Sequence, residues 1–118
     1  MSATTRTSSA NKNGSRWLPK WRRLAIYLRD GFTCTYCGRD LHSAPAADVT
    51  LDHLVCRCDA VDHTSANLVT ACRRCNSQRQ DKPWREYATG GAVDRIEGLI
   101  VAPINESLAK AILVGKAA

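Results

Sequence analysis

Two cysteine pairs and the residues between them have the types and spacing that predict chemistry. Cys34 and Cys37 form the first pair, Cys72 and Cys75 form the second, and two residues separate the members of each pair. Two such pairs supply four thiolates, which is the complete tetrahedral shell of a structural zinc. A zinc with four protein ligands has no open position for a substrate, so any reaction must use other residues.

The segment between the pairs carries the polar residues suited to a reaction. It is longer than the roughly 15–20 residues of a simple zinc ribbon, and it contains the dipeptide Asp52-His53. Asn67 precedes the second pair, and Asn76 follows it directly. A neutral imidazole can accept a proton from water near pH 7. Carboxylate and amide oxygens are ligands that Mg²⁺ or Mn²⁺ prefers.

In order and spacing, these residues resemble the HNH (ββα-metal) endonuclease family over about residues 17 to 85. The matching elements are Arg29-Asp30-Gly31, Cys34-x-x-Cys37-Gly38, Leu51-Asp52-His53, Asn67-Leu68-Val69-Thr70-Ala71-Cys72 and Cys75-Asn76. The three letters of the family name read His53, Asn67 and Asn76 here, an H-N-N variant of the compact kind found in phages and bacteria. The resemblance implies an α+β fold, in which a small zinc-stapled ββα-metal domain has flanking helices.

The resemblance also implies metal-dependent hydrolysis of phosphodiester bonds in DNA. It assigns His53 as the general base, Asp52 and Asn76 as ligands of a catalytic Mg²⁺ or Mn²⁺, and Asn67 as the residue that orients His53. Adjacent residues on a regular strand point to opposite faces, so Asp52 and His53 share a site only if the backbone twists or they flank the metal and the phosphate. The alternative is a non-catalytic zinc-finger module that binds nucleic acid, which has no need of these residues together.

The net charge favours a polyanionic partner. The 118 residues include 17 Lys and Arg against 11 Asp and Glu, a formal charge of +6. We expect phosphate contacts from basic residues near His53 and along the helix after the second cysteine pair, namely Arg57, Arg73, Arg74, Arg79 and Lys82. Such contacts give salt-sensitive binding with little sequence information.

The sequence predicts a cytoplasmic location, in a bacterial cell or a phage-infected host. It contains no apolar run near 18 residues that predicts a membrane span, and its first residues lack the apolar core of a secretory signal. In that reducing compartment, metal binding is the better interpretation of six cysteines. We interpret the other two, Cys56 and Cys58, as one buried and one exposed free cysteine.

Composition and periodicity predict the organisation of the chain. We expect a disordered tail over 1–15, an HNH endonuclease domain over 16–88 and a helical C-terminal extension over 89–118. The expected elements are a helix over Pro19–Asp30, strands over Val49–Cys56 and Leu68–Ala71, a helix over Arg73–Lys82, and a last helix that begins near Asn105 or Ser107. Trp84, Tyr87 and Ala88 are expected to pack on the first helix. The C-terminal helices either complete the core or form a contact with a second copy of the chain or with another protein, and the sequence leaves these alternatives open.

Overall fold

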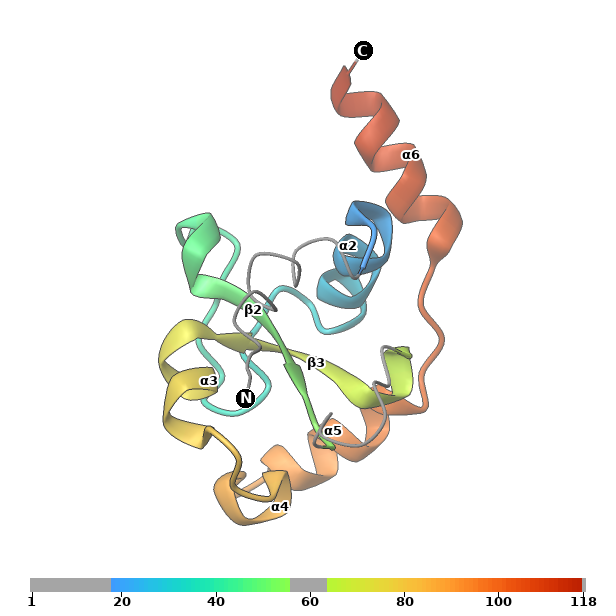
Figure 1. Ribbon diagram of the computed structural model, residues 1–118. Coiled ribbons are helices and arrows are strands. Elements are labelled where there is room, and N and C mark those ends of the chain that lie inside the picture. Colours follow the sequence, from blue (N-terminus) through green and yellow to red (C-terminus); the bar gives the residue numbers. More distant parts are fainter. Residues whose placement is uncertain (1–17, 56–63, 118) are drawn as a thin grey trace, which may run out of the picture.

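The computed structural model describes residues 18–55 and 64–117, and the described part has an α+β fold (Figure 1). Its elements are α2 (Lys20–Arg29), β2 (Val49–His53), β3 (Leu68–Cys72), α3 (Arg73–Arg79), α4 (Trp84–Tyr87), α5 (Ala92–Ile100) and α6 (Glu106–Ala117), with 3-10 turns at Ala46–Asp48 and Ser65–Asn67. The predicted α+β class is confirmed. The predicted tail, Arg57, Cys56 and Cys58 lie outside the described residues.

The sheet consists of β2 and β3, which pair antiparallel with Asp52 opposite Val69 and His53 opposite Leu68. Residues that face each other in this ladder share a face, and successive residues alternate. The face of Asp52 is therefore opposite to the face of His53. The expected strand continues to Cys56, but β2 ends at His53. The Leu54 N–H still donates to the Asn67 carbonyl, whereas the Val55 N–H donates to the Asn67 side chain in place of a strand partner.

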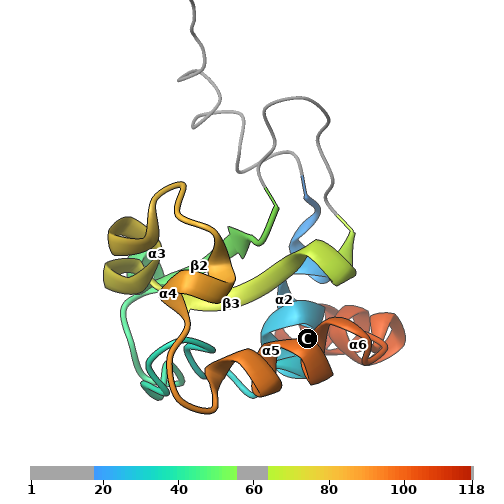
Figure 2. The same ribbon diagram turned by 90° about the horizontal axis from the view of Figure 1, so that it is seen from below.

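Two helices cover the two faces of this sheet. On one face, Asn76 of α3 donates its amide N–H to the Thr50 hydroxyl, with 3.0 Å between Nδ2 and Oγ1. On the other face, Ile26 of α2 forms a buried cluster with Leu18 and Leu68. Figure 2 shows α3 and α2 on opposite sides of the strands. Because a two-stranded sheet is marginal alone, these helices are needed for its stability.

The first helix begins and ends where the sequence predicts. Pro19 precedes α2, and Gly31, with φ 68°, follows shortly after its last residue. Glycine adopts this left-handed conformation without the steric penalty of a side chain, so it suits the end of a helix. The most deeply buried residues of α2 are Ala25 and Ile26.

A second buried cluster includes Cys34, Cys72 and Cys75, whereas Cys37 is exposed. It includes Ala88, Ala92 and Ile96, so α5 contributes to the same core as the cysteines. Trp84 and Tyr87 of α4 also pack on this cluster, whereas we expected them on α2. The reason is that α3 ends at Arg79 and the backbone turns at Gln80, which has φ 52°.

The last helix lies beside α2, and its C-terminal end extends beyond the rest of the molecule (Figure 1). Asn105 begins it as predicted, because its Oδ1 accepts a hydrogen bond of 2.9 Å from the Leu108 N–H. Ala109 is fully buried, and Lys110 places its ammonium 4.8 Å from the ring centre of Trp21 in α2. Within the described residues, no helix has the length and apolarity to cross a bilayer.

Candidate functional site

The four paired cysteines lie together and form what we call the four-cysteine site. The sulfur atoms of Cys34, Cys37, Cys72 and Cys75 all lie within 4.8 Å of one another. The Sγ atoms of Cys37 and Cys72 are 3.9 Å apart. Zn–S bonds of about 2.3 Å in a tetrahedron place sulfur atoms at about 3.8 Å from each other, so the arrangement and the all-thiol donor set fit zinc.

Backbone hydrogen bonds shape the two cysteine turns. The N–H of Cys37 points at the Cys34 sulfur at 3.5 Å, and the N–H of Cys75 points at the Cys72 sulfur at 3.4 Å. Gly38, with φ 80°, closes the first turn by donating to the Cys34 carbonyl at 2.9 Å. These N–H groups stabilise thiolates, because a sulfur anion is a better acceptor than a thiol.

A buried ion pair joins α2 to β3. Arg29 and Asp30 lie 2.7 Å apart between Nε and Oδ1, with side chains 2% and 0% exposed. Arg29 also donates to the carbonyls of Ser65 and Leu68, and Asp30 accepts from the Thr70 N–H at 2.8 Å. The pair therefore fixes where β3 begins and holds it beside the first cysteine turn.

Asp52 lies in a buried polar arrangement. Its residue is 4% exposed, and its two carboxylate oxygens accept hydrogen bonds of 2.8 and 2.7 Å from Nη1 of Arg79. The Tyr36 hydroxyl donates to Oδ2 of the same carboxylate. Burial raises the pKa of Asp52, and the hydrogen bond from Tyr36 and the charge of Arg79 oppose that shift. Burial, together with the charge of Asp52, raises the pKa of Tyr36, so its hydroxyl stays a donor at neutral pH.

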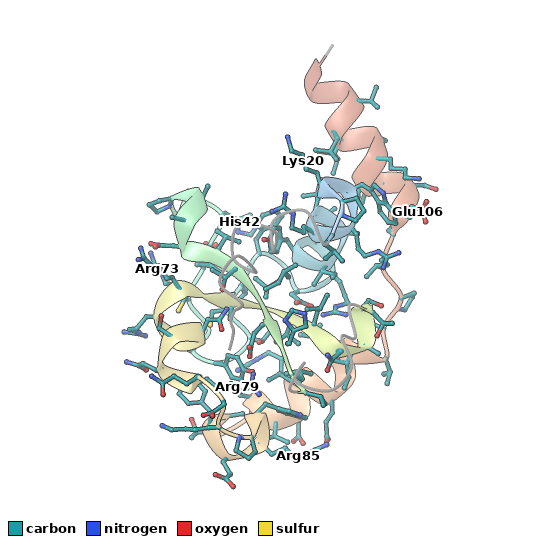
Figure 3. All side chains as sticks on the ribbon, viewed as in Figure 1. Lys20, His42, Arg73, Arg79, Arg85 and Glu106 are labelled. Atoms are coloured by element: carbon teal, nitrogen blue, oxygen red, sulfur yellow. The ribbon has the colours of Figure 1, made fainter. Side chains whose placement is uncertain are left out.

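The Arg79 guanidinium is directed into the protein, toward the strands (Figure 3). Besides Asp52 it binds the carbonyls of His53 and Leu54, at 2.7 and 2.8 Å, and its Nε binds the Lys82 carbonyl at 2.9 Å. We expected Arg79 to contact phosphate, but in this structure the residue is 5% exposed and its nitrogen atoms are engaged inside. Arg73, at the outer edge of α3 in Figure 3, is exposed.

Asn67 binds the two backbone N–H groups that follow His53. Asn67 is 4% exposed, and its carbonyl and Oδ1 accept from the N–H groups of Leu54 and Val55, both at 2.9 Å. His53 itself is half-buried and is the last residue of β2. The strand end that bears His53 is thus fixed by Asn67, the residue just before β3, and by Arg79 from α3.

Residues 34–82 match the family model of the HNH endonucleases. This part of the chain is similar to an HNH endonuclease domain. The match begins at the first cysteine of the four-cysteine site and extends past the end of α3, so it covers both cysteine turns and both strands. No curated protein and no solved structure matched the chain.

The matched region also presents donors of the types that a hard divalent ion prefers. A carboxylate offers about four acceptor positions, and Arg79 and Tyr36 take three on Asp52, so at most one remains for a cation. The Asn76 side chain donates from Nδ2 to Thr50 and to the Leu51 carbonyl, which leaves Oδ1 as its ligand atom. The donor types fit Mg²⁺ or Mn²⁺, with one oxygen from Asp52 and one from Asn76.

The roles of three buried side chains escaped our sequence interpretation. Arg79 was expected to contact phosphate, and Arg29 and Tyr36 were assigned no role in the fold. One signal was present for Arg79, which lies four residues after Cys75 and therefore on the same face of the helix as a buried metal ligand. Arg29 belonged to the matching Arg29-Asp30-Gly31 element, but that element carries no assigned role.

Proposed function

We propose that the chain is a metal-dependent DNA endonuclease in which His53 acts as the general base. The observation that supports this most is the double fixation of the strand end at His53, by Arg79 and by Asn67. A general base needs a fixed position relative to the phosphate, which a module that only binds nucleic acid does not require of this residue. The family match and the basic charge support the same proposal.

Hydrolysis of a phosphodiester needs a nucleophilic water, relief of charge on the phosphate and help for the leaving oxygen. The imidazole of His53 takes the proton from the attacking water. Asp52 and Asn76 would hold Mg²⁺ or Mn²⁺, which offsets negative charge on the phosphate. Because Asp52 and His53 lie on opposite faces of β2, the ion and the base would flank the phosphate at the strand end. Zinc at the four-cysteine site has a structural role, because four thiolates leave no position for substrate.

The substrate-binding surface follows the outer side of α3. Arg73 and Arg74 on this helix and Lys82 just beyond it are exposed. Their side chains can bind phosphates that flank the scissile bond without reading the bases. Arg57 remains a candidate from the sequence alone.

Binding to DNA is expected to weaken steeply with salt and to depend on Arg73, Arg74 and Lys82. Each replacement by alanine should lower affinity and reduce the slope of log K against log salt by about one, because one phosphate contact is lost. Fluorescence anisotropy between 50 and 200 mM salt, a range that resolves such slopes, measures this effect. Arg85→Ala is the control, since Arg85 is exposed on α4 and pairs with Glu97. An unchanged slope in all three variants would exclude this surface.

Plasmid cleavage in Mg²⁺, in Mn²⁺ and in EDTA tests the function directly. We expect nicked or linear products with either ion and none in EDTA. Zinc content is measured in each sample, so that loss of the structural metal is not mistaken for loss of the catalytic ion. Binding of DNA without cleavage in every ion tried would favour the non-catalytic module.

A further inference from the structure

The Arg79 guanidinium binds both the Asp52 carboxylate and the backbone at His53, which the proposed reaction needs in a fixed arrangement. We propose that Arg79 is a positioning residue, which sets the places of His53 and Asp52 relative to the four-cysteine site. The catalytic consequence rests on the proposed function, whereas the arrangement itself can be tested on the resting protein.

The hydrogen bonds of Arg79 define the orientation of the strand end. Nη1 binds the Asp52 carboxylate and the His53 carbonyl, and Nη2 binds the Leu54 carbonyl. Nε binds the Lys82 carbonyl, which anchors the guanidinium to the residues just after α3. Because the guanidinium is planar and its donors are fixed, one group holds two consecutive carbonyls and a carboxylate in a single geometry. The side chains of Arg79 and Asp52 are each 6% exposed, so water competes little for these contacts.

The hydrogen bonds of Arg79 and Tyr36 connect the backbone at His53 to the four-cysteine site. Arg79 lies one helical turn after Cys75, on the same face of α3. Tyr36 lies between Cys34 and Cys37 and donates its hydroxyl to Asp52. Tyr36 of the first cysteine turn and Arg79, one helical turn after the second, therefore both bind the Asp52 carboxylate. Arg79 extends the connection to the carbonyl of His53.

Replacement of Arg79 with lysine tests whether the site depends on the geometry of the guanidinium or only on its positive charge. Lysine keeps a positive charge beside buried Asp52, but one ammonium cannot reach the acceptors on Asp52, His53, Leu54 and Lys82 together. We expect Arg79→Lys to keep its zinc and its DNA affinity, while kcat falls about 10–100-fold, the usual effect of losing a group that orients a site. Arg85→Lys, in an exposed pair with Glu97, is the matched control and should change neither.

Nuclear magnetic resonance provides a readout that needs no activity. The chain has three histidines, and His42 is exposed and bonded to Asp40. Arg79→Lys should shift the imidazole signals of His53 and leave those of His42 in place. In the unmodified protein, the buried Nε–H of Arg79 should exchange with solvent far more slowly than the exposed Nε–H of Arg85.

The outcomes separate this proposal from the proposed function. Equal exchange rates for Arg79 and Arg85 overturn the positioning role, and this measurement decides the matter even if Arg79→Lys fails to fold. Unchanged His53 signals with unchanged kcat in Arg79→Lys overturn it as well, and the endonuclease function then stands. If the unmodified protein cuts no DNA yet the His53 signals respond to Arg79→Lys, the function fails and the arrangement stands.

Discussion

His53→Ala is expected to lower the rate of DNA cleavage by roughly 10²–10⁴-fold, the usual contribution of a general base. Zinc content, folding and DNA affinity should stay close to those of the unmodified protein. The reason is that Arg79 and Asn67 hold the backbone of this strand end, and those contacts do not use the imidazole. Single-turnover cleavage of a labelled duplex, with zinc analysis of the same sample, measures the effect.

His42→Ala is the control for that experiment. Its imidazole is exposed and bonded to Asp40, so we expect cleavage at the rate of the unmodified protein. Cleavage at full rate by His53→Ala in EDTA is the result that would end the proposed mechanism, because it would require neither the base nor the divalent ion.

Cys72→Ser is expected to release the zinc and to leave a poorly folded chain. Cys72 is fully buried, precedes the first residue of α3 and accepts the N–H of Cys75, so its loss removes a ligand from the centre of the core. Structural zinc contributes about 10–16 kcal/mol of binding free energy in small domains, and most of this stabilisation appears only on folding. Metal analysis should show one zinc in the unmodified protein and little in the variant, and circular dichroism should show the loss of a cooperative transition.

Two other serine variants complete the test of the zinc assignment. Cys56→Ser and Cys58→Ser should keep one zinc per chain, because the four-cysteine site already supplies the full ligand set. A Cys72→Ser protein that keeps its zinc and melts like the unmodified chain would show that the ligand assignment is wrong.

The ligand quartet and the order of elements were predictable from the sequence for local reasons. Each cysteine pair brings two sulfur atoms together within one turn, so spacing alone indicates the site. Asn105 was predictable as the start of α6 because capping depends on residues three positions apart. Periodicity likewise placed α2 to within one residue at each end.

The contacts that hold Asp52 were not predictable, because they join residues far apart in the sequence. Arg79 binds Asp52, which lies 27 positions earlier in the chain, and no residue next to either one indicates this contact. Arginine and aspartate are mostly exposed in proteins, so composition favours the surface for both. The contacts of Arg29 escaped prediction for the same reason, since its acceptors in Ser65 and Leu68 lie in a distant segment.

The early end of α3 also escaped prediction. The residues up to Lys82 favour a helix, yet Gln80 adopts φ 52° and the helix stops at Arg79. The Lys82 carbonyl then accepts the Nε–H of Arg79, a contact that a continuous helix would not make in the same way. Tertiary hydrogen bonding has overridden local helix propensity here.

The separation of the two cysteine turns along the chain has a consequence for the order of folding. Thr35 of the first turn binds the Thr70 carbonyl of β3, and the Cys37 sulfur lies beside that of Cys72, so both contacts close loops of 35 positions. Contacts between such distant segments slow folding, because the loop must close before they form. During synthesis the first turn emerges with two thiolates only, which are half of a zinc shell. Tight metal capture must therefore await the completion of α3, which makes it a closing step of folding and exposes the unfinished chain to competing thiol chemistry until then.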